Sequence, residues 1–333
     1  MVNPWIQFLL CAVLIIFAGT KLTKNAAVVA ENTGIGTAWI GALMLPLATS
    51  LPELVTTIRA VSIDAPDLAL GNVLGSCLFN LSLLAVIDIV SGKGPMTARL
   101  NQGHIITASL SITTICLASI AMLGIVYVPV GWVGMETLLI AVVFIYGNRL
   151  LYRYERRNLF RPGGAEEMHT PGVTVSTRRA LLNFALAAVL IIAAGVLVTD
   201  ASDRIALETG LGHTFVGSIF LAVSTSLPET VTTFSAVRMG YLDMAVANVF
   251  GANFMNLFIV FLADLFYLPE PLLYNVSGSH LASALIVILI TTTIIFGMVY
   301  RSEKKIGRIG FDTLLVLAGY FTAAYLLFRS GGN

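Results

Sequence analysis

Long and almost unbroken apolar runs dominate the chain, and polar residues gather between them. A membrane-spanning helix needs about 20 mostly apolar residues, and spanning strands are excluded because these runs do not alternate. We therefore predict an all-α polytopic membrane protein. Its ten predicted transmembrane helices lie at about residues 4–20, 37–61, 67–91, 104–126, 128–149, 179–199, 213–237, 243–267, 280–300 and 309–328.

The composition agrees with this prediction. Hydrophobic residues make up 57% of the chain and charged residues only 11%, whereas a soluble domain has about 25% charged residues. A chain so poor in charge cannot cover a water-facing surface. Most of its surface is therefore expected to face the lipid bilayer, and nothing in the composition suggests a nucleic-acid partner.

The distribution of basic residues predicts the topology. If the N-terminus lies outside, the loops that fall inside hold every lysine and arginine except Arg59, Arg204 and Arg329. Basic residues concentrate in cytoplasmic loops. We therefore expect a multi-pass protein of the cell membrane with both termini extracellular and the 150–178 loop in the cytoplasm.

An internal repeat divides the chain into two halves. Residues 49–57 read TSLPELVTT and residues 225–233 read TSLPETVTT, and the match continues without a gap to Asn80 and Asn256 at a constant offset of 176. Five helices separate equivalent elements, and an odd number inverts their direction. We predict two inverted-topology five-helix repeats, an architecture of secondary transporters. The expected units are 1–150 (motif 41–91), a cytoplasmic linker 151–178, and 179–333 (motif 217–267).

Two carboxylates occupy equivalent positions inside the apolar runs. An ionised Glu53 or Glu229 in a membrane costs about 2.5–3.5 kcal/mol or more, and a bound cation or a proton would offset that cost. The adjacent Pro52 and Pro228 disrupt helix hydrogen bonding, which would free carbonyl oxygens as ligands. Thr49 and Thr225 lie four residues before each glutamate, so we expect each pair to share a helix face.

The neighbouring helices add further oxygen ligands. Asn72, Ser76 and Asn80 form a polar stripe, which Asn248 and Asn256 repeat with Ala252 in place of the serine. The set contains carboxylate, hydroxyl and amide oxygens but no Cys or His. Such hard ligands suit Ca²⁺, which takes 6–8 oxygens in flexible geometry. Na⁺ is of similar size, so one cavity can take either ion by turn.

These motifs resemble those of the Ca²⁺/cation antiporter superfamily, and the chain looks like its prokaryotic sodium/calcium exchanger-like members. The resemblance rests on TSLPE followed by GNVLGSCLFN (71–80), and on TSLPE followed by ANVFGANFMN (247–256). It implies a Ca²⁺ site of Thr49, Glu53, Thr225 and Glu229. It implies Na⁺ or co-ion ligands at Ser50, Ser76, Asn80, Ser226 and Asn256. Ala252 and Asn256 depart from the serine and the frequent aspartate of Na⁺/Ca²⁺ exchangers, which places the Na⁺ coupling in question.

Some residues keep two interpretations. Asn72 and Asn248 are either ligands or helix-packing contacts. Asp88 and Asp264 match at the same offset near the predicted helix ends. We interpret them as solvated ends or caps rather than as parts of an ion access path.

We predict a secondary active antiporter that exchanges Ca²⁺ for Na⁺ by alternating access. The alternative is a Ca²⁺/H⁺ antiporter that uses the same two glutamates, and a cation channel is a distant third. An enzyme is not expected, because no nucleophile–base pair, phosphate loop or zinc motif is present. No permanently bound cofactor and no regulatory domain are expected. The sequence does not give the oligomeric state, and a monomer would suffice for transport.

Overall fold

The computed structural model describes residues 3–91, 95–125, 127–159, 175–209, 223–301, 305–306 and 309–330. Most of them are helical. The long helices are α1 (Pro4–Thr33), α5 (Pro66–Ser91), α6 (Gly103–Met122), α7 (Met135–Leu159), α8 (Thr177–Glu208), α11 (Leu242–Phe266), α12 (Ser279–Tyr300) and α13 (Phe311–Ser330). The shorter ones are α2 (Thr37–Trp39), the π-helix η1 (Ile40–Met44), α3 (Leu45–Thr49), α4 (Leu51–Ser62), α10 (Leu227–Arg238), and the 3₁₀ turns η2 (Met96–Arg99) and η3 (Leu272–Tyr274). Two antiparallel hairpins pair β1 (Pro129–Val130) with β2 (Val133–Gly134), and β3 (Lys305–Ile306) with β4 (Ile309–Gly310).

Seven of the described helices are long and apolar enough to cross a membrane, and the bent pair Thr37–Thr49 and Leu51–Ser62 gives an eighth span if counted as one. The chain is therefore a multi-span membrane protein. The count of ten helices stays a prediction. Much of the expected helix 213–237 lies outside the described residues, which resume at residue 223, and α13 contains only a shorter apolar stretch, Asp312–Ala323.

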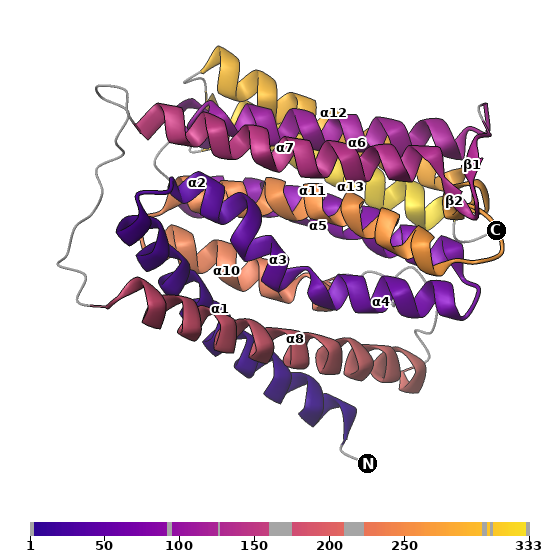
Figure 1. Cartoon of the computed structure of the whole chain (residues 1–333), viewed down its shortest axis with the longest axis horizontal. Helices are drawn as coiled ribbons and strands as arrows, with labels where there is room; N and C mark the ends of the chain where they lie inside the picture. The colour runs from indigo at the N-terminus through magenta and orange to yellow at the C-terminus, as the bar shows by residue number, and fades with distance from the viewer. Residues whose placement is uncertain are drawn as a thin grey trace.

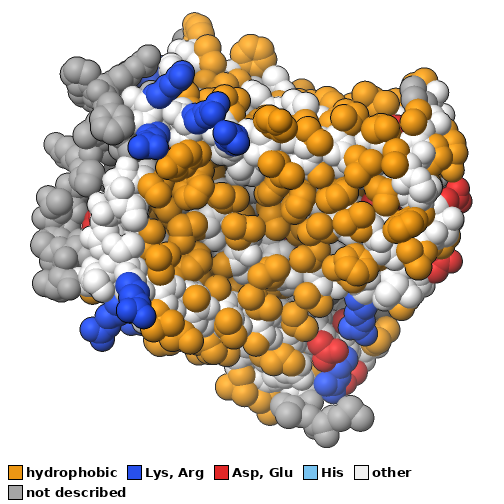
Figure 2. Space-filling model, viewed as in Figure 1, with side chains coloured by type: hydrophobic (Ala, Val, Ile, Leu, Met, Phe, Trp, Pro, Cys, Tyr) orange, Lys and Arg blue, Asp and Glu red, His pale blue; other side chains and the backbone are white. Residues whose placement is uncertain are grey.

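Helices α5 and α11 form the centre of the molecule, where they pack against each other. The most apolar stretch of each is 72% buried, against 28–44% for the other spans. Apart from the polar stripe on each helix, apolar residues surround both of them, a pattern typical of fully buried helices. In Figure 1, α6, α7 and α12 lie on one side of this pair, and α1 and α8 lie on the other. Figure 2 shows that hydrophobic side chains cover most of the visible face, with several Lys and Arg side chains toward one end.

The first repeat motif lies on a broken helix. The segment α2–η1–α3 ends at Thr49, and α4 begins at Leu51 after a bend of 46°. Pro52 lies in the first turn of α4, where its missing N–H costs no helix hydrogen bond. Thr49 and Glu53 therefore belong to two differently directed helices, so the expectation that they share one helix face is wrong. The chain repeats this local geometry before α10, where Ser226 has φ −86° and ψ 12°, against −88° and 9° at Ser50.

Several helix ends differ from the prediction. The helix expected at 4–20 continues to Thr33, where Gly34 ends it in the left-handed region with φ 64°. Hydropathy marks the part of a helix that lies in lipid, and the exposed Lys21 and Lys24 are good helix formers beyond that part.

The fifth expected helix, 128–149, is shifted. Residues 129–134 form the hairpin of β1 and β2, and α7 runs from Met135 to Leu159. The linker expected at 151–178 is therefore helical at both ends, because α8 already begins at Thr177. Its middle, residues 160–174, lies outside the described residues.

Two buried aspartates, Asp264 and Asp88, form hydrogen bonds with loop residues and with the first turn of another helix. The Asp264 carboxylate accepts the backbone N–H groups of Leu272 (2.7 Å) and Gly134 (2.9 Å) and the hydroxyl of Thr137. It thus caps the beginning of α7. The side chain is fully buried, so the expectation of a solvated helix end is wrong. The interpretation as a cap is correct, although Asp264 caps a helix other than its own.

Asp88 is bound in the equivalent way at the beginning of α13. Its partners are the backbone N–H groups of Met96 (2.7 Å) and Gly310 (3.5 Å) and the hydroxyl of Thr313 (2.5 Å). Each of these partners lies 176 residues from the equivalent partner of Asp264. Met96 corresponds to Leu272, Gly310 to Gly134, and Thr313 to Thr137. The same offset relates the His104–Asp243 pair (2.5 Å) to the His280–Asp67 pair (3.1 Å). The repeat thus extends from sequence to tertiary contacts.

Candidate cation site

The two glutamates of the repeat lie buried near the middle of the molecule. Glu53 is in the first turn of α4 and Glu229 in the first turn of α10, and each is only 1% exposed. Within the part of the chain that the structure describes, neither forms an ion pair with a basic side chain. Two carboxylates buried in this way need compensating positive charge or protons.

Serines connect the two halves across the site. The Ser50 hydroxyl donates to Oε1 of Glu229 at 2.9 Å, and the Ser226 hydroxyl donates to Oε1 of Glu53 at 3.4 Å. Each serine is the residue at the helix break, three positions before the glutamate of its own half. The two breaks therefore face each other and bring the two TSLPE motifs into one site.

In addition to Oδ1 of Asn248, four buried oxygen atoms at the site have no hydrogen-bond donor among the described residues. They are Oε2 of Glu53, Oε2 of Glu229, Oδ1 of Asn80 and Oδ1 of Asn256. A buried acceptor without a partner costs about 1–3 kcal/mol, and native proteins rarely leave one unsatisfied. All four atoms are acceptors, and a desolvated cation would satisfy them together.

The remaining predicted ligands also lie at this place. Ser226 Oγ is 3.2 Å from Ser76 Oγ on α5. Thr49 is fully buried, and its hydroxyl donates to the carbonyl of Leu45 at 3.1 Å. Thr225 is fully buried directly before Ser226. The structure thus brings hydroxyl, carboxylate and amide oxygens of both halves together.

Asn72 and Asn248 donate hydrogen bonds to the backbone carbonyls of the two glutamates. The side-chain amide of Asn72 donates to the Glu53 carbonyl (3.5 Å) and to Thr57 Oγ1 (3.1 Å). Asn248 donates to the Glu229 carbonyl (3.5 Å) and to Thr233 Oγ1 (2.8 Å). Of the two interpretations of these asparagines, these bonds favour packing contacts that hold α4 against α5 and α10 against α11.

Sequence reasoning missed Asn253, whose side chain joins α11 to Cys77 and Asn80 of α5. Its amide donates to the Cys77 carbonyl at 3.2 Å, and its Oδ1 accepts from Asn80 Nδ2 at 3.1 Å. Cys77 and Asn253 occupy equivalent positions in the two repeats. The hydrogen bond between them therefore lies at the contact between the two halves. An asparagine in the middle of an apolar run, opposite a cysteine in the other repeat, is the signal that could have identified it.

The comparison with known families agrees with this arrangement. The model of the family described as sodium/calcium exchanger protein matches residues 3–152 and 179–330. The chain belongs to the sodium/calcium exchanger protein family. Among curated proteins, the chain is similar to the inner membrane protein YrbG of Escherichia coli strain K12, with 26% identity over 307 residues that cover 89% of this chain and 88% of YrbG.

Two further relatives are similar over most of their length. The sodium/calcium exchanger MaX1 of Methanosarcina acetivorans is 25% identical over 322 residues, covering 86% of this chain and 90% of MaX1. A solved structure of the sodium-calcium exchanger NCX_Mj, soaked with Na⁺ and Ca²⁺, superposes with a TM-score of 0.72 at 20% identity and covers 98% of both chains. At this identity the structural match establishes the fold. Family and relatives together establish a cation antiporter of the membrane rather than an enzyme family.

Proposed function

We propose that this antiporter moves Ca²⁺ across the membrane in exchange for Na⁺, and that both ions bind between the two TSLPE motifs. The observation that supports this most directly is the set of four buried acceptor oxygens without donors, on Glu53, Glu229, Asn80 and Asn256. Two carboxylates balance the charge of one Ca²⁺. Hydroxyl and carbonyl oxygens can complete the 6–8 ligands that Ca²⁺ prefers.

In this proposal the Ca²⁺ ligands come from the two helix breaks, and the co-ion ligands lie beside them. Ca²⁺ binds to Thr49, Glu53, Thr225 and Glu229. The co-ion binds to Ser50, Ser76, Asn80, Ser226 and Asn256. Ser50 and Ser226 already contact the glutamates, so Na⁺ and Ca²⁺ would share carboxylate oxygens. Sharing makes the two ions compete, and competition is the basis of exchange.

The transport cycle follows from two inverted five-helix halves. The offset-related contacts of Asp88 and Asp264, and the crossed bonds of Ser50 and Ser226, are those expected for two halves related by a two-fold axis. Two equivalent halves can exchange conformations, which opens the site alternately to either side. We place both termini outside and the 150–178 loop in the cytoplasm, since exposed arginines cluster at the end of α7 and the start of α8.

A Ca²⁺/H⁺ antiporter is the second candidate. Ala252 is fully buried where the repeat has Ser76 in the other half, so one half of the site lacks a hydroxyl ligand for Na⁺. Protons could then replace Na⁺ by binding to Glu53 and Glu229 when Ca²⁺ leaves.

Ca²⁺ uptake into proteoliposomes distinguishes the two mechanisms. One set of vesicles is loaded with Na⁺ at equal pH on both sides, and the other is free of Na⁺ with an imposed pH gradient. Uptake that requires internal Na⁺ supports the exchange of Ca²⁺ for Na⁺. Uptake driven by the pH gradient alone would overturn Na⁺ coupling and assign proton transfer to the two glutamates. Absence of Ca²⁺ movement under both gradients would overturn Ca²⁺ as the substrate.

A further inference from the structure

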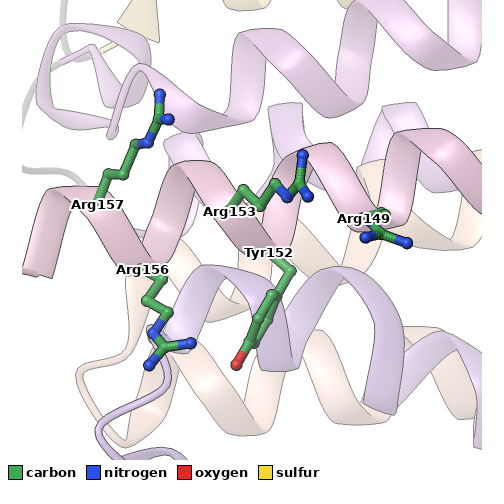
Figure 3. Close-up of a pocket in the computed structure, with 5 residues that line it drawn as sticks. All are labelled: Arg149, Tyr152, Arg153, Arg156 and Arg157. Carbon is green, nitrogen blue, oxygen red and sulfur yellow. The ribbon is translucent and has the colours of Figure 1, made fainter.

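Glu155 is a buried carboxylate near the end of α7. Its side chain is only 6% exposed, and its Oε1 has no hydrogen-bond donor among the described residues. Neither of the two ion pairs in that part of the chain includes it. The neighbouring arginines are exposed, and Figure 3 shows Arg153 and Arg157 extending from one side of α7 and Tyr152 and Arg156 from the other. A buried carboxylate without a cationic partner needs a proton or another source of positive charge.

The Glu155 carboxylate lies between the starts of two helices. A Cβ atom at Gly36, directly before α2, would lie 2.5 Å from Oε2, and one at Gly103, the first residue of α6, would lie 2.7 Å from Oε1. The two glycines therefore leave the space that the carboxylate fills. Because helix N-termini attract negative charge, the ionised carboxylate holds the start of the helical segment Thr37–Thr49 to α6 and α7.

His104 and Asp243 are the two charged groups that act on Glu155. His104, in the first turn of α6, is 1% exposed, and its Nε2 lies 2.5 Å from Oδ1 of Asp243 in the first turn of α11. Even when His104 carries a proton, it balances only one of the two acids. The three groups then keep one excess negative charge, which a proton on Glu155 would remove.

The other ionisable side chains around these three residues do not supply the missing positive charge. Tyr154 of α7 lies beside Gly103 and is neutral at physiological pH. Tyr241, two residues before Asp243, donates its hydroxyl to Glu31 of α1 at 2.5 Å. No group of three or more His, Cys, Asp or Glu side chains among the described residues is placed to hold a metal ion, so a proton is the ligand that fits.

The repeat contains this third acid in one half only. The histidine–aspartate pair recurs at the offset of 176 as His280 and Asp67, whereas the residue equivalent to Glu155 is Gly331. The second pair, joined at 3.1 Å, is also more exposed, with 12% and 57% against 1% and 13% for the first. A feature that both halves need for folding recurs at the offset, so an acid that occurs once points to a role on one side of the membrane. In the topology proposed above, this is the cytoplasmic side.

We propose that Glu155 is a proton-binding site through which the pH on this side of the membrane controls the broken helix. The ionised carboxylate holds the start of Thr37–Thr49, and the protonated carboxyl group releases it. The segment ends at Thr49 beside the cation site, so its release speeds the opening and closing of that site. Proton binding at Glu155 does not depend on which ions the protein exchanges, and only its effect on the transport rate rests on the proposed function.

The fluorescence of Trp39 tests proton binding directly. Trp39 is the last residue of α2, and its ring packs edge-to-face against Tyr152 of α7, with centroids 5.5 Å apart. Replacing Trp5 and Trp132 by Phe leaves it as the single tryptophan. In purified protein in detergent without Ca²⁺ or Na⁺, its emission should show one transition between about pH 8 and about pH 4. Glu155→Gln should abolish this transition, and Glu155→Asp, which keeps the carboxylate, should retain one.

The initial rate of Ca²⁺ uptake measures the consequence for transport. In proteoliposomes that hold the protein in a known orientation, acidification of the side that carries Glu155 should raise this rate roughly 3- to 10-fold, the size expected when a carboxylate at two helix starts loses its charge. Glu155→Gln should transport at the raised rate at every pH. Because the fluorescence titration needs no transport, a failure of Ca²⁺ exchange would overturn the proposed function and leave the proton site intact.

The matched control is His280→Gln, in the equivalent pair of the other half, which should keep the Trp39 transition. Loss of the transition in both variants would show a general effect of pH and would overturn the site. A transition that survives in Glu155→Gln would overturn Glu155 as the proton acceptor, and its loss in His104→Gln would then assign the proton to the histidine. A wild-type transport rate that does not respond to the pH on this side would overturn the control of the broken helix.

Discussion

Ser50 of one half donates its hydroxyl hydrogen to Glu229 of the other half at 2.9 Å. The equivalent bond joins Ser226 to Glu53 at 3.4 Å. Each bond occupies Oε1 of a glutamate, and Oε2 of both glutamates is left without a donor among the described residues. The crossed bonds thus orient each carboxylate through one oxygen atom, and the other oxygen atom stays available to bind a cation. A change in either half is therefore expected to affect the ligands of the other.

Neutralising either glutamate should abolish Ca²⁺ transport. In Glu53→Gln or Glu229→Gln, one carboxylate oxygen is replaced by an NH₂ group, which repels a cation. Removing one partner of a desolvated charge pair costs about 3–5 kcal/mol, which corresponds to roughly 150- to 4,000-fold weaker Ca²⁺ binding. Ca²⁺ uptake into proteoliposomes and Ca²⁺ binding by calorimetry measure this loss.

The control for these variants is Glu270→Gln, because Glu270 is exposed in the loop after α11. It should transport at the wild-type rate. Size-exclusion profiles of all three variants should match the wild type, so that loss of transport cannot be attributed to unfolding. Full transport by either site variant would refute the assignment of the carboxylates.

Ala252→Ser should strengthen coupling to Na⁺. Ala252 is fully buried and equivalent to Ser76, whose hydroxyl lies 3.2 Å from Ser226. By the symmetry of the repeat, a serine hydroxyl at 252 would face Ser50 and add an oxygen ligand. If Na⁺ is the co-ion, the Na⁺ concentration for half-maximal Ca²⁺ uptake should fall several-fold. In the opposite change, Ser76→Ala, it should rise. No response to Na⁺ in either variant would favour H⁺ as the co-ion.

Much of the arrangement follows from the sequence because the repeat is strict. The constant offset of 176 between TSLPEL and TSLPET predicts that the two motifs are equivalent. The high cost of a lone buried carboxylate predicts that Glu53 and Glu229 share one site. The structure brings both motifs together through Ser50 and Ser226, as these two inferences require.

Other features depend on tertiary contacts that local patterns do not contain. Asp264 looks like a residue at a solvated helix end, but it binds Gly134 and Leu272 from distant segments. Asn253 has a cysteine, Cys77, at the equivalent position of the first repeat, so a search for identical residues in the two halves does not find it. The helix containing Lys21 extends beyond the lipid, and the end of an apolar run does not mark the end of the helix.

Asp264→Asn should destabilise the protein without changing its ion affinity. The Asp264 carboxylate accepts two backbone N–H groups and the hydroxyl of Thr137, and an amide nitrogen cannot accept any of them. Hydrogen bonds to charged groups contribute about 1.5–3 kcal/mol each, so a loss of about 2–4 kcal/mol is expected. Thermal unfolding measures it. Glu270→Gln is the control, because Glu270 is exposed in the loop after α11, and it should change stability by less than about 1 kcal/mol.

Gly251→Ala should push α11 away from η1 and so destabilise the protein. A Cβ atom at Gly251 of α11 would lie 2.6 Å from Cα of Ala42 and would also collide with the Ala42 carbonyl. Because both are backbone atoms, only a shift of η1 relative to α11 can relieve the collision, at a cost of about 3 kcal/mol or more. The unfolding temperature should fall by several degrees. Gly278→Ala is the matched control, since nothing lies within 4 Å of the added atom, and it should leave stability within about 0.5 kcal/mol of wild type. If Gly251→Ala were as stable as Gly278→Ala, the close approach of η1 and α11 would not be a feature of the native protein.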